Sequence, residues 1–239
     1  MAIEEKTVEF MRKIYILHGW TYSTDKWEPF LTSLQKSGVE SVMVKIPGLT
    51  TPLNDVWTID DYVEWLKKSL DKEKGKVVLL GHSNGGRIIL AFAVKYPAKV
   101  KNIILIDSAG IYHDELPIRI KRFVFGKLAK LGKGIRNIKF LRKLFYVFVQ
   151  EHDYQKADPV LRQTMHNLIT YDISVFLETI INSTTIIWGR NDKITPLSDG
   201  EYMHTLIKNS SLYIIDTARH SPQFTNTEEV AAIVIKAIK

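Results

Sequence analysis

Six short runs rich in isoleucine and valine recur along the 239-residue chain, and most are separated by segments with helical periodicity. Each run is five or six residues long and nearly continuously apolar, which is typical of parallel strands covered on both faces. The alternation predicts an α/β protein with a mostly parallel sheet flanked by helices. The predicted strands are Lys13–Leu17, Ser41–Ile46, Lys76–Leu80, Asn102–Ile106, Thr184–Trp188 and Ser211–Ile215. The predicted helices are Lys26–Lys36, Ile59–Leu70, Gly85–Lys95, Ser198–Leu206 and Thr227–Ile238.

One interval interrupts this alternation. About 75 residues between Ile106 and Thr184 contain no strand-like run and have the pattern of amphipathic helices. An insertion of this size predicts a helical cap, with residues 1–110 and 183–239 forming the core and 111–182 the cap. The predicted cap helices are Ile118–Leu131, Ile135–Val149, Pro159–Asn167 and Ser174–Asn182.

The net positive charge of the chain arises from one segment of the predicted cap. The formal net charge is +7, but residues 111–150 hold ten Lys/Arg and two Asp/Glu, which leaves about −1 for the rest. No recognised binding motif accompanies this charge, so we expect no nucleic-acid partner. Docking of the basic cap on an anionic membrane is an alternative, because basic amphipathic helices can lie on membranes. More often, the apolar side of such helices covers the active site while the Lys and Arg side chains face water.

Composition excludes several other classes. The chain has no cysteine, so disulfides, thiol nucleophiles and thiolate metal sites are absent. No window approaches the ~18 uninterrupted apolar residues of a membrane-spanning helix. The N-terminal sequence MAIEEKTVEFMRK lacks the apolar core of a secretory signal, so we expect a cytoplasmic protein.

The strongest local motif is Gly81-His82-Ser83-Asn84-Gly85, which lies where a predicted strand leads into a predicted helix. A G-x-S-x-G sequence in that context forms a tight turn that exposes the serine Oγ above the sheet. We therefore expect Ser83 to be a nucleophile. The alternative is a helix-capping serine with packing glycines.

A serine nucleophile needs a base, and the base needs an orienting acid. Of the seven histidines, His220 lies in a polar turn just after the last predicted strand, at the carboxyl edge of the sheet. Asp192 follows the preceding strand, and the chain order Ser83, Asp192, His220 is that of the G-x-S-x-G hydrolases. Asp107, at the end of another predicted strand, is the competing acid.

An acyl-transfer site also needs N–H donors directed at the developing oxyanion. The backbone N–H of Asn84 lies at the positive start of the elbow helix. The second donor is expected from the loop His18-Gly19-Trp20, in which Gly19 permits close approach and Trp20 supplies its backbone N–H.

Several segments together resemble the α/β-hydrolase fold superfamily over nearly the whole chain. Besides the elbow GHSNGG, they are HGW, YPAKVKNIILIDSAG, GRNDKITP and ARHSPQFTNTEEV. The HGW loop with a downstream tryptophan most resembles bacterial carboxylesterases and aryl esterases. The resemblance implies a Ser83–Asp192–His220 triad with Trp20 and Asn84 as the oxyanion hole, and no metal or cofactor.

The predicted function is hydrolysis of carboxylic esters through an acyl-enzyme. Lactone hydrolysis, C–C hydrolysis and acyl transfer use the same machinery and stay open, as does a receptor-like binding protein with the same fold. Family members that are epoxide hydrolases or haloalkane dehalogenases carry a carboxylate at the elbow, so Ser83 excludes those activities. Aromatic residues of the predicted cap suggest a small-molecule ester with a hydrophobic part; they are Phe123, Phe125, Phe140, Phe145, Phe148 and Phe176.

Overall fold

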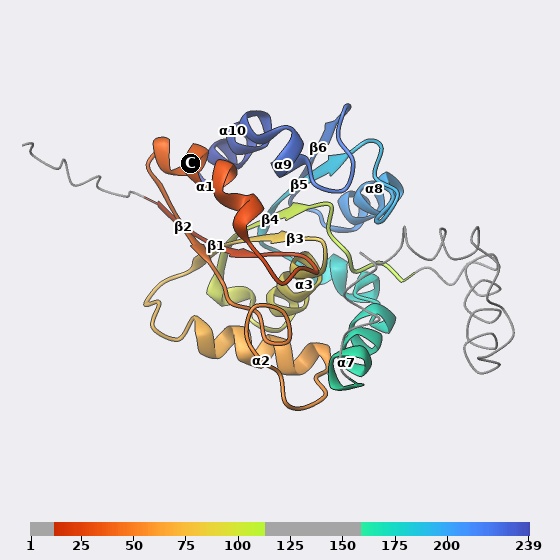
Figure 1. Ribbon diagram of the computed structural model, residues 1–239. Helices are drawn as coiled ribbons and strands as arrows, with labels where there is room; N and C mark the ends of the chain where they lie inside the picture. The colour runs from red at the N-terminus through yellow and green to blue at the C-terminus, as the bar shows by residue number, and fades with distance from the viewer. Residues whose placement is uncertain (1–11, 113–158) are drawn as a thin grey trace, which may run out of the picture.

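The computed structural model describes residues 12–112 and 159–239 (Figure 1). Six strands form one sheet in the order β2-β1-β3-β4-β5-β6, and every neighbouring pair is parallel. The strands are β1 (Arg12–Leu17), β2 (Val39–Met43), β3 (Val77–His82), β4 (Val100–Ile106), β5 (Ser183–Gly189) and β6 (Ser210–Ile215). The predicted parallel α/β fold is confirmed.

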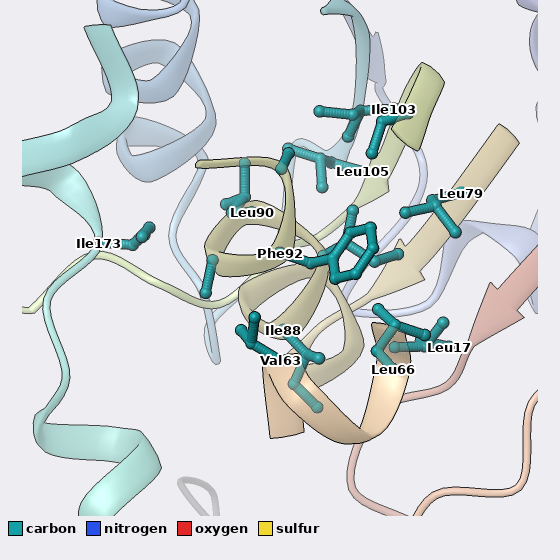
Figure 2. Packing of buried hydrophobic residues seen from close by; sticks show 14 of the residues in the cluster. Leu17, Val63, Leu66, Leu79, Ile88, Leu90, Phe92, Ile103, Leu105 and Ile173 are labelled. Atoms are coloured by element: carbon teal, nitrogen blue, oxygen red, sulfur yellow. The ribbon is translucent and has the colours of Figure 1, made fainter. Parts of the chain in front are cut away.

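Alternate residues of each strand enter two different hydrophobic clusters. Ile14 and Ile16 of β1 pack with helices α1 (Glu28–Lys36) and α10 (Thr227–Ala237). Tyr15 and Leu17 point to the opposite face, which is covered by α2 (Ile59–Ser69) and α3 (Asn84–Lys95) (Figure 1). Figure 2 shows this second cluster, where Phe92 of α3 lies among leucines of β3, β4 and α2. Both faces of the sheet are thus covered, which explains why the strands are nearly all apolar.

Local sequence signals set several helix ends. Thr58 caps α2 by accepting a hydrogen bond from the Asp61 N–H, and the Asp61 carboxylate accepts one from the Thr58 N–H, forming a capping box. The other helical elements are η1 (Asp25–Trp27), η2 (Pro97–Lys99), α7 (Pro159–Thr170), η3 (Ser174–Thr179), α8 (Leu197–Leu206) and α9 (Pro222–Thr225).

Most predicted bounds differ from the structure by one to three residues, and two elements show where the sequence pattern misleads. The strand predicted at Ser41–Ile46 is β2, which starts at Val39 and ends at Met43. It ends earlier than predicted because the chain turns after it: the Thr50 hydroxyl accepts a hydrogen bond from the Ile46 N–H at 2.7 Å. Ile46 is buried in this turn, so its apolar character does not mark a strand. The helix predicted at Ser174–Asn182 is only the short 3₁₀ helix η3.

Part of the predicted cap is described. Leu168 of α7, Ile173, and Leu177 of η3 are fully buried in the same cluster as Leu79 of β3 and Phe92. The two predicted helices between 118 and 149 lie outside the described residues, and the division into core and cap stays a prediction. No helix in the described ranges has the length and apolarity needed to cross a bilayer.

Parallel strands bring distant parts of the sequence to one edge. Because all six strands run in one direction, the loops after β1, β3, β4, β5 and β6 leave the sheet at the same edge. These loops and the first residue of α3 carry every side chain or amide that the sequence predicts for the site, and open α/β sheets bind ligands at this edge.

Candidate active site

Ser83 lies in a strained turn between β3 and α3. Its backbone φ of 52° and ψ of −119° place a non-glycine residue in a sparsely populated conformation. A Cβ on Gly81 would lie 2.5 Å from the Gly86 Cα, and one on Gly85 would lie 2.1 Å from the Leu17 carbonyl oxygen. Both positions therefore require glycine for the strand and helix to approach so closely.

His220 bridges the serine and the acid. Its Nε2 lies 3.1 Å from Ser83 Oγ, and its Nδ1 lies 2.7 Å from Asp192 Oδ2. Asp192 accepts at Nδ1, which fixes the proton on that nitrogen and leaves Nε2 free to accept the serine proton. The three predicted residues, separated by up to 137 positions in the chain, lie in one hydrogen-bonded row.

Asp192 is held from several sides. Its Oδ1 accepts hydrogen bonds from the backbone N–H groups of Ile194 (2.7 Å) and Thr195 (3.2 Å). Its Oδ2 lies 2.8 Å from Thr195 Oγ1 in addition to His220. These donors compensate the burial of a carboxylate whose side chain has no exposed surface.

The competing acid, Asp107, has a different environment. Its Oδ1 accepts a hydrogen bond from the Gly189 N–H at 2.8 Å, while its Oδ2 is buried without a hydrogen-bond partner in the described ranges. Burial, followed by the nearby charge of Asp192, raises the pKa of Asp107 well above its usual range. The raised pKa favours the neutral form of Asp107, and His220 Nδ1–H donates its hydrogen bond to Asp192 Oδ2 instead.

The two predicted oxyanion donors belong to segments that lie next to the serine. Asn84 is the first residue of α3, so its N–H lies at the positive end of the helix. A Cβ on Gly19 would lie 3.0 Å from the Ser83 Cβ, so the loop carrying Trp20 runs directly against the nucleophile. Neither amide donates a hydrogen bond within residues 12–112 and 159–239. Their role as an oxyanion hole stays a prediction.

Sequence reasoning missed two residues of this site. His82 points its Nε2 at the His220 carbonyl oxygen, 2.9 Å away, and so supports the backbone of the histidine loop. Thr195 contacts both Asp192 and His220. A hydroxyl three residues after the acid, in GRNDKITP, was the available signal for Thr195; nothing in the sequence pairs His82 with residue 220.

One group in the described residues has the side chains to hold a metal ion: His82, Asp107 and His220, with ligand atoms within 4.8 Å of one another. Both ring nitrogens of His220 already contact Asp192 and Ser83, and His82 Nε2 bonds to the His220 carbonyl oxygen. A metal there would have to displace these contacts, so the donor set fits a proton relay better than a metal centre.

Replacing His82 by glutamine is expected to weaken the loss of stability in acid. Burial, followed by the neighbouring His220, lowers the pKa of His82 to about 3, whereas an unfolded histidine titrates near 6.5. Between about pH 6.5 and pH 3, the unfolded chain therefore binds a proton at His82 that the folded chain does not bind. The free energy of unfolding is highest above about pH 6.5 and decreases as the pH falls toward 3. The slope approaches ~1.4 kcal/mol per pH unit for one such group. Urea unfolding of wild type and H82Q at pH 4 to 7 measures it.

The control for this experiment is His204→Gln, because His204 is exposed on α8. The raised pKa of Asp107 has the opposite effect on the free energy of unfolding. It stabilises the folded state at low pH, and this contribution is lost as the pH rises through the pKa of Asp107 in the folded chain. Only the difference between variants therefore isolates His82. An H82Q profile parallel to wild type would show that His82 is not kept neutral by folding.

The parallel sheet, the strand–serine–helix turn and the order of Ser83, Asp192 and His220 in the chain are together typical of one class of protein, the α/β hydrolases. The chain belongs to the α/β hydrolase fold family, whose model matches residues 13–141. The predicted family and the predicted enzyme class are both confirmed, and ester hydrolases are prominent among its relatives.

Relatives with similarity over almost the full chain include two kinds of hydrolase. The pimeloyl-[acyl-carrier protein] methyl ester esterase of Legionella pneumophila (strain Paris) is 25% identical over 235 residues, covering 95% of each chain. The 2-hydroxy-6-oxononadienedioate/2-hydroxy-6-oxononatrienedioate hydrolase 1 of Pseudomonas putida is 25% identical over 251 residues, covering 93% of this chain and 86% of its own.

Solved structures show the same fold. A thermophilic esterase from Thermogutta terrifontis has a TM-score of 0.70 at 19% identity, covering 95% of this chain and 91% of its own. A meta-cleavage product hydrolase from Pseudomonas fluorescens IP01 has a TM-score of 0.65 at 20% identity, covering 95% and 90%.

Proposed function

We propose that this protein is a carboxylesterase that works through an acyl-enzyme on Ser83. The observation that carries the proposal is the row of contacts Ser83 Oγ–His220 Nε2 and His220 Nδ1–Asp192 Oδ2, at 3.1 and 2.7 Å. A serine hydroxyl at this distance from a correctly oriented imidazole is the arrangement that nucleophilic acyl transfer needs.

In the proposed reaction, His220 Nε2 takes the proton of Ser83 as Oγ attacks the ester carbonyl carbon. The N–H groups of Trp20 and Asn84 hold the oxyanion, and Asp192 stabilises the imidazolium. The tetrahedral intermediate collapses when His220 protonates the leaving alcohol. His220 then removes a proton from water, the hydroxide attacks the acyl carbon, and Ser83 leaves with a proton from His220.

The proposed substrate is an ester with a hydrophobic acyl or alcohol part. The aromatic residues that suggested it lie mostly outside the described residues, and Phe176 of η3 is 41% exposed. The relatives named as acting on a carrier-protein-bound methyl ester extend the proposal. The basic segment 111–150 would suit an ester presented on an acidic carrier, because opposite charges speed association and make it sensitive to salt.

A second candidate is hydrolysis of a C–C bond next to a ketone, favoured by the similarity to the Pseudomonas putida hydrolase. It uses the same serine and histidine, so the geometry of the triad does not separate the two reactions. The substrate does: an ester releases an alcohol, whereas a C–C substrate requires a carbon leaving group to be protonated.

A substrate panel tests the proposal. Purified protein is assayed with p-nitrophenyl esters of increasing chain length, a lactone, a methyl ester free and attached to an acyl carrier protein, and a 2-hydroxy-6-oxo-dienoate. We expect turnover of the esters. Turnover of the dienoate alone would favour the second candidate, and turnover of neither class would favour a binding protein. A fall in kcat/KM with added salt that appears only for the carrier-bound ester would support the carrier proposal.

A further inference from the structure

We propose that Thr195 is a positioning residue for Asp192, and through it for His220; this rests on the proposed function. Thr195 follows β5 in the acid loop and is largely buried. Its Oγ1 lies 2.8 Å from Asp192 Oδ2, the same oxygen that accepts the hydrogen bond from His220 Nδ1. The hydroxyl is therefore a second donor to the carboxylate oxygen that orients the imidazole.

The single proton of the Thr195 hydroxyl has three possible neighbours. His220 Nδ1, at 3.3 Å, must carry its own proton to bond to Asp192 and so does not accept. The Asp107 carbonyl oxygen, at 3.1 Å, is a neutral acceptor. The Asp192 carboxylate oxygen is closer and charged, and charge-assisted hydrogen bonds are shorter and stronger. We therefore assign the hydrogen bond donated by the Thr195 hydroxyl to Asp192 Oδ2.

Thr195 holds the carboxylate at both oxygens. Its backbone N–H donates to Oδ1 and its hydroxyl to Oδ2, so one residue fixes the rotation of the carboxylate plane. The backbone of Thr195 is itself fixed, because its carbonyl oxygen accepts a hydrogen bond from the indole Nε1 of the fully buried Trp188 at 3.0 Å. Without the hydroxyl, His220 is the remaining hydrogen-bond donor to Oδ2 among the described residues.

Removal of the hydroxyl also changes the charge that His220 experiences. The hydrogen bond from the Thr195 hydroxyl offsets part of the negative charge on Asp192 Oδ2. Without that hydrogen bond, the Asp192 carboxylate stabilises the protonated His220 ring more strongly. Among residues 12–112 and 159–239, the other titratable groups against the His220 ring are His82 and Asp107, and burial favours the neutral form of both. The proposal therefore predicts that the acid limb of the kcat/KM profile moves to higher pH when the hydroxyl is lost.

The test compares Thr195→Val, which keeps the shape and removes the hydroxyl, with Thr195→Ser, which keeps the hydroxyl and removes a methyl group. For T195V we expect kcat to fall about 10- to 100-fold, the range for a lost hydrogen bond to a charged group, with KM little changed. The acid limb should shift upward by a few tenths of a pH unit. T195S should stay within about threefold of wild type with an unshifted limb.

Two outcomes overturn the proposal: full activity and an unshifted limb in T195V, or equal impairment of T195S and T195V, which would mean that packing matters and the hydroxyl does not. The double variant T195V/D192N, compared with D192N, still tests the proposal if T195V is poorly stable. It should be no slower than D192N alone, because Thr195 acts through Asp192. If Ser83→Ala keeps full turnover, the proposed function itself fails; if Ser83→Ala is inactive while T195V equals wild type, only the role of Thr195 fails.

Discussion

Replacing Ser83 by alanine is expected to lower kcat on an ester by about 10⁵- to 10⁶-fold while KM changes little, because the nucleophile is lost and the acyl-enzyme cannot form. The residual rate would come from the oxyanion donors and substrate binding alone. Turnover of the best p-nitrophenyl ester measures the loss. A fluorophosphonate that labels serine nucleophiles should modify the peptide containing Ser83 in wild type and leave S83A unmodified.

Two controls accompany this variant. Ser69→Ala removes an exposed hydroxyl on α2 that bonds to the Trp65 carbonyl oxygen, and it should leave turnover unchanged. Ser83→Gly should be as inactive as S83A but more stable in thermal unfolding, because glycine relieves the positive φ of 52°. Turnover or labelling that survives in S83A would remove Ser83 from the mechanism.

Replacing Asp192 by asparagine is expected to lower kcat about 10⁴-fold with little change in the fold. An amide at 192 can donate to His220 Nδ1, which would move the imidazole proton to Nε2 and leave no base facing Ser83. The distances of 2.7 and 3.1 Å on the two sides of His220 are the reason for expecting so large an effect. Steady-state kinetics across pH 5 to 9, with thermal unfolding to confirm folding, measure it.

Asp107→Asn is the matched comparison. The raised pKa of Asp107 favours the neutral carboxyl, and an amide oxygen can still accept the hydrogen bond from the Gly189 N–H. D107N is therefore expected to keep kcat within a few-fold of wild type. The opposite pattern, with D107N inactive and D192N active, would assign the acid to the end of β4.

Most of the fold was predictable because it depends on local hydrophobic patterns. Continuous apolar runs arise from covering both faces of a parallel sheet, and the structure covers both faces with helices. The prediction was wrong where an apolar residue is buried for another reason. Ile46 packs inside a turn and does not belong to β2, and its burial depends on neighbours that periodicity does not report.

Part of the candidate site was also predictable from the sequence, and part was not. Ser83, His220 and Asp192 could be proposed from a short motif, from chain order and from their places after strands, because a parallel sheet brings all its strand ends to one edge. The preference for Asp192 over Asp107 had weaker grounds, since both follow strands. The structure separates them by hydrogen bonding: four donors surround Asp192, whereas Asp107 keeps one buried oxygen without a partner in the described ranges.

The sequence by itself determined the class of fold, the order of its elements and the nucleophile turn, because each depends on residues that are neighbours in the chain. Only the tertiary structure decided which acid meets His220, that Thr195 bonds to that acid, and that His82 supports the histidine loop. Those contacts join the ends of different strands, and their distances follow from how β3, β5 and β6 pack in the sheet. Hydrogen bonds act over about 3 Å, so a motif can name the candidates while packing selects the partners.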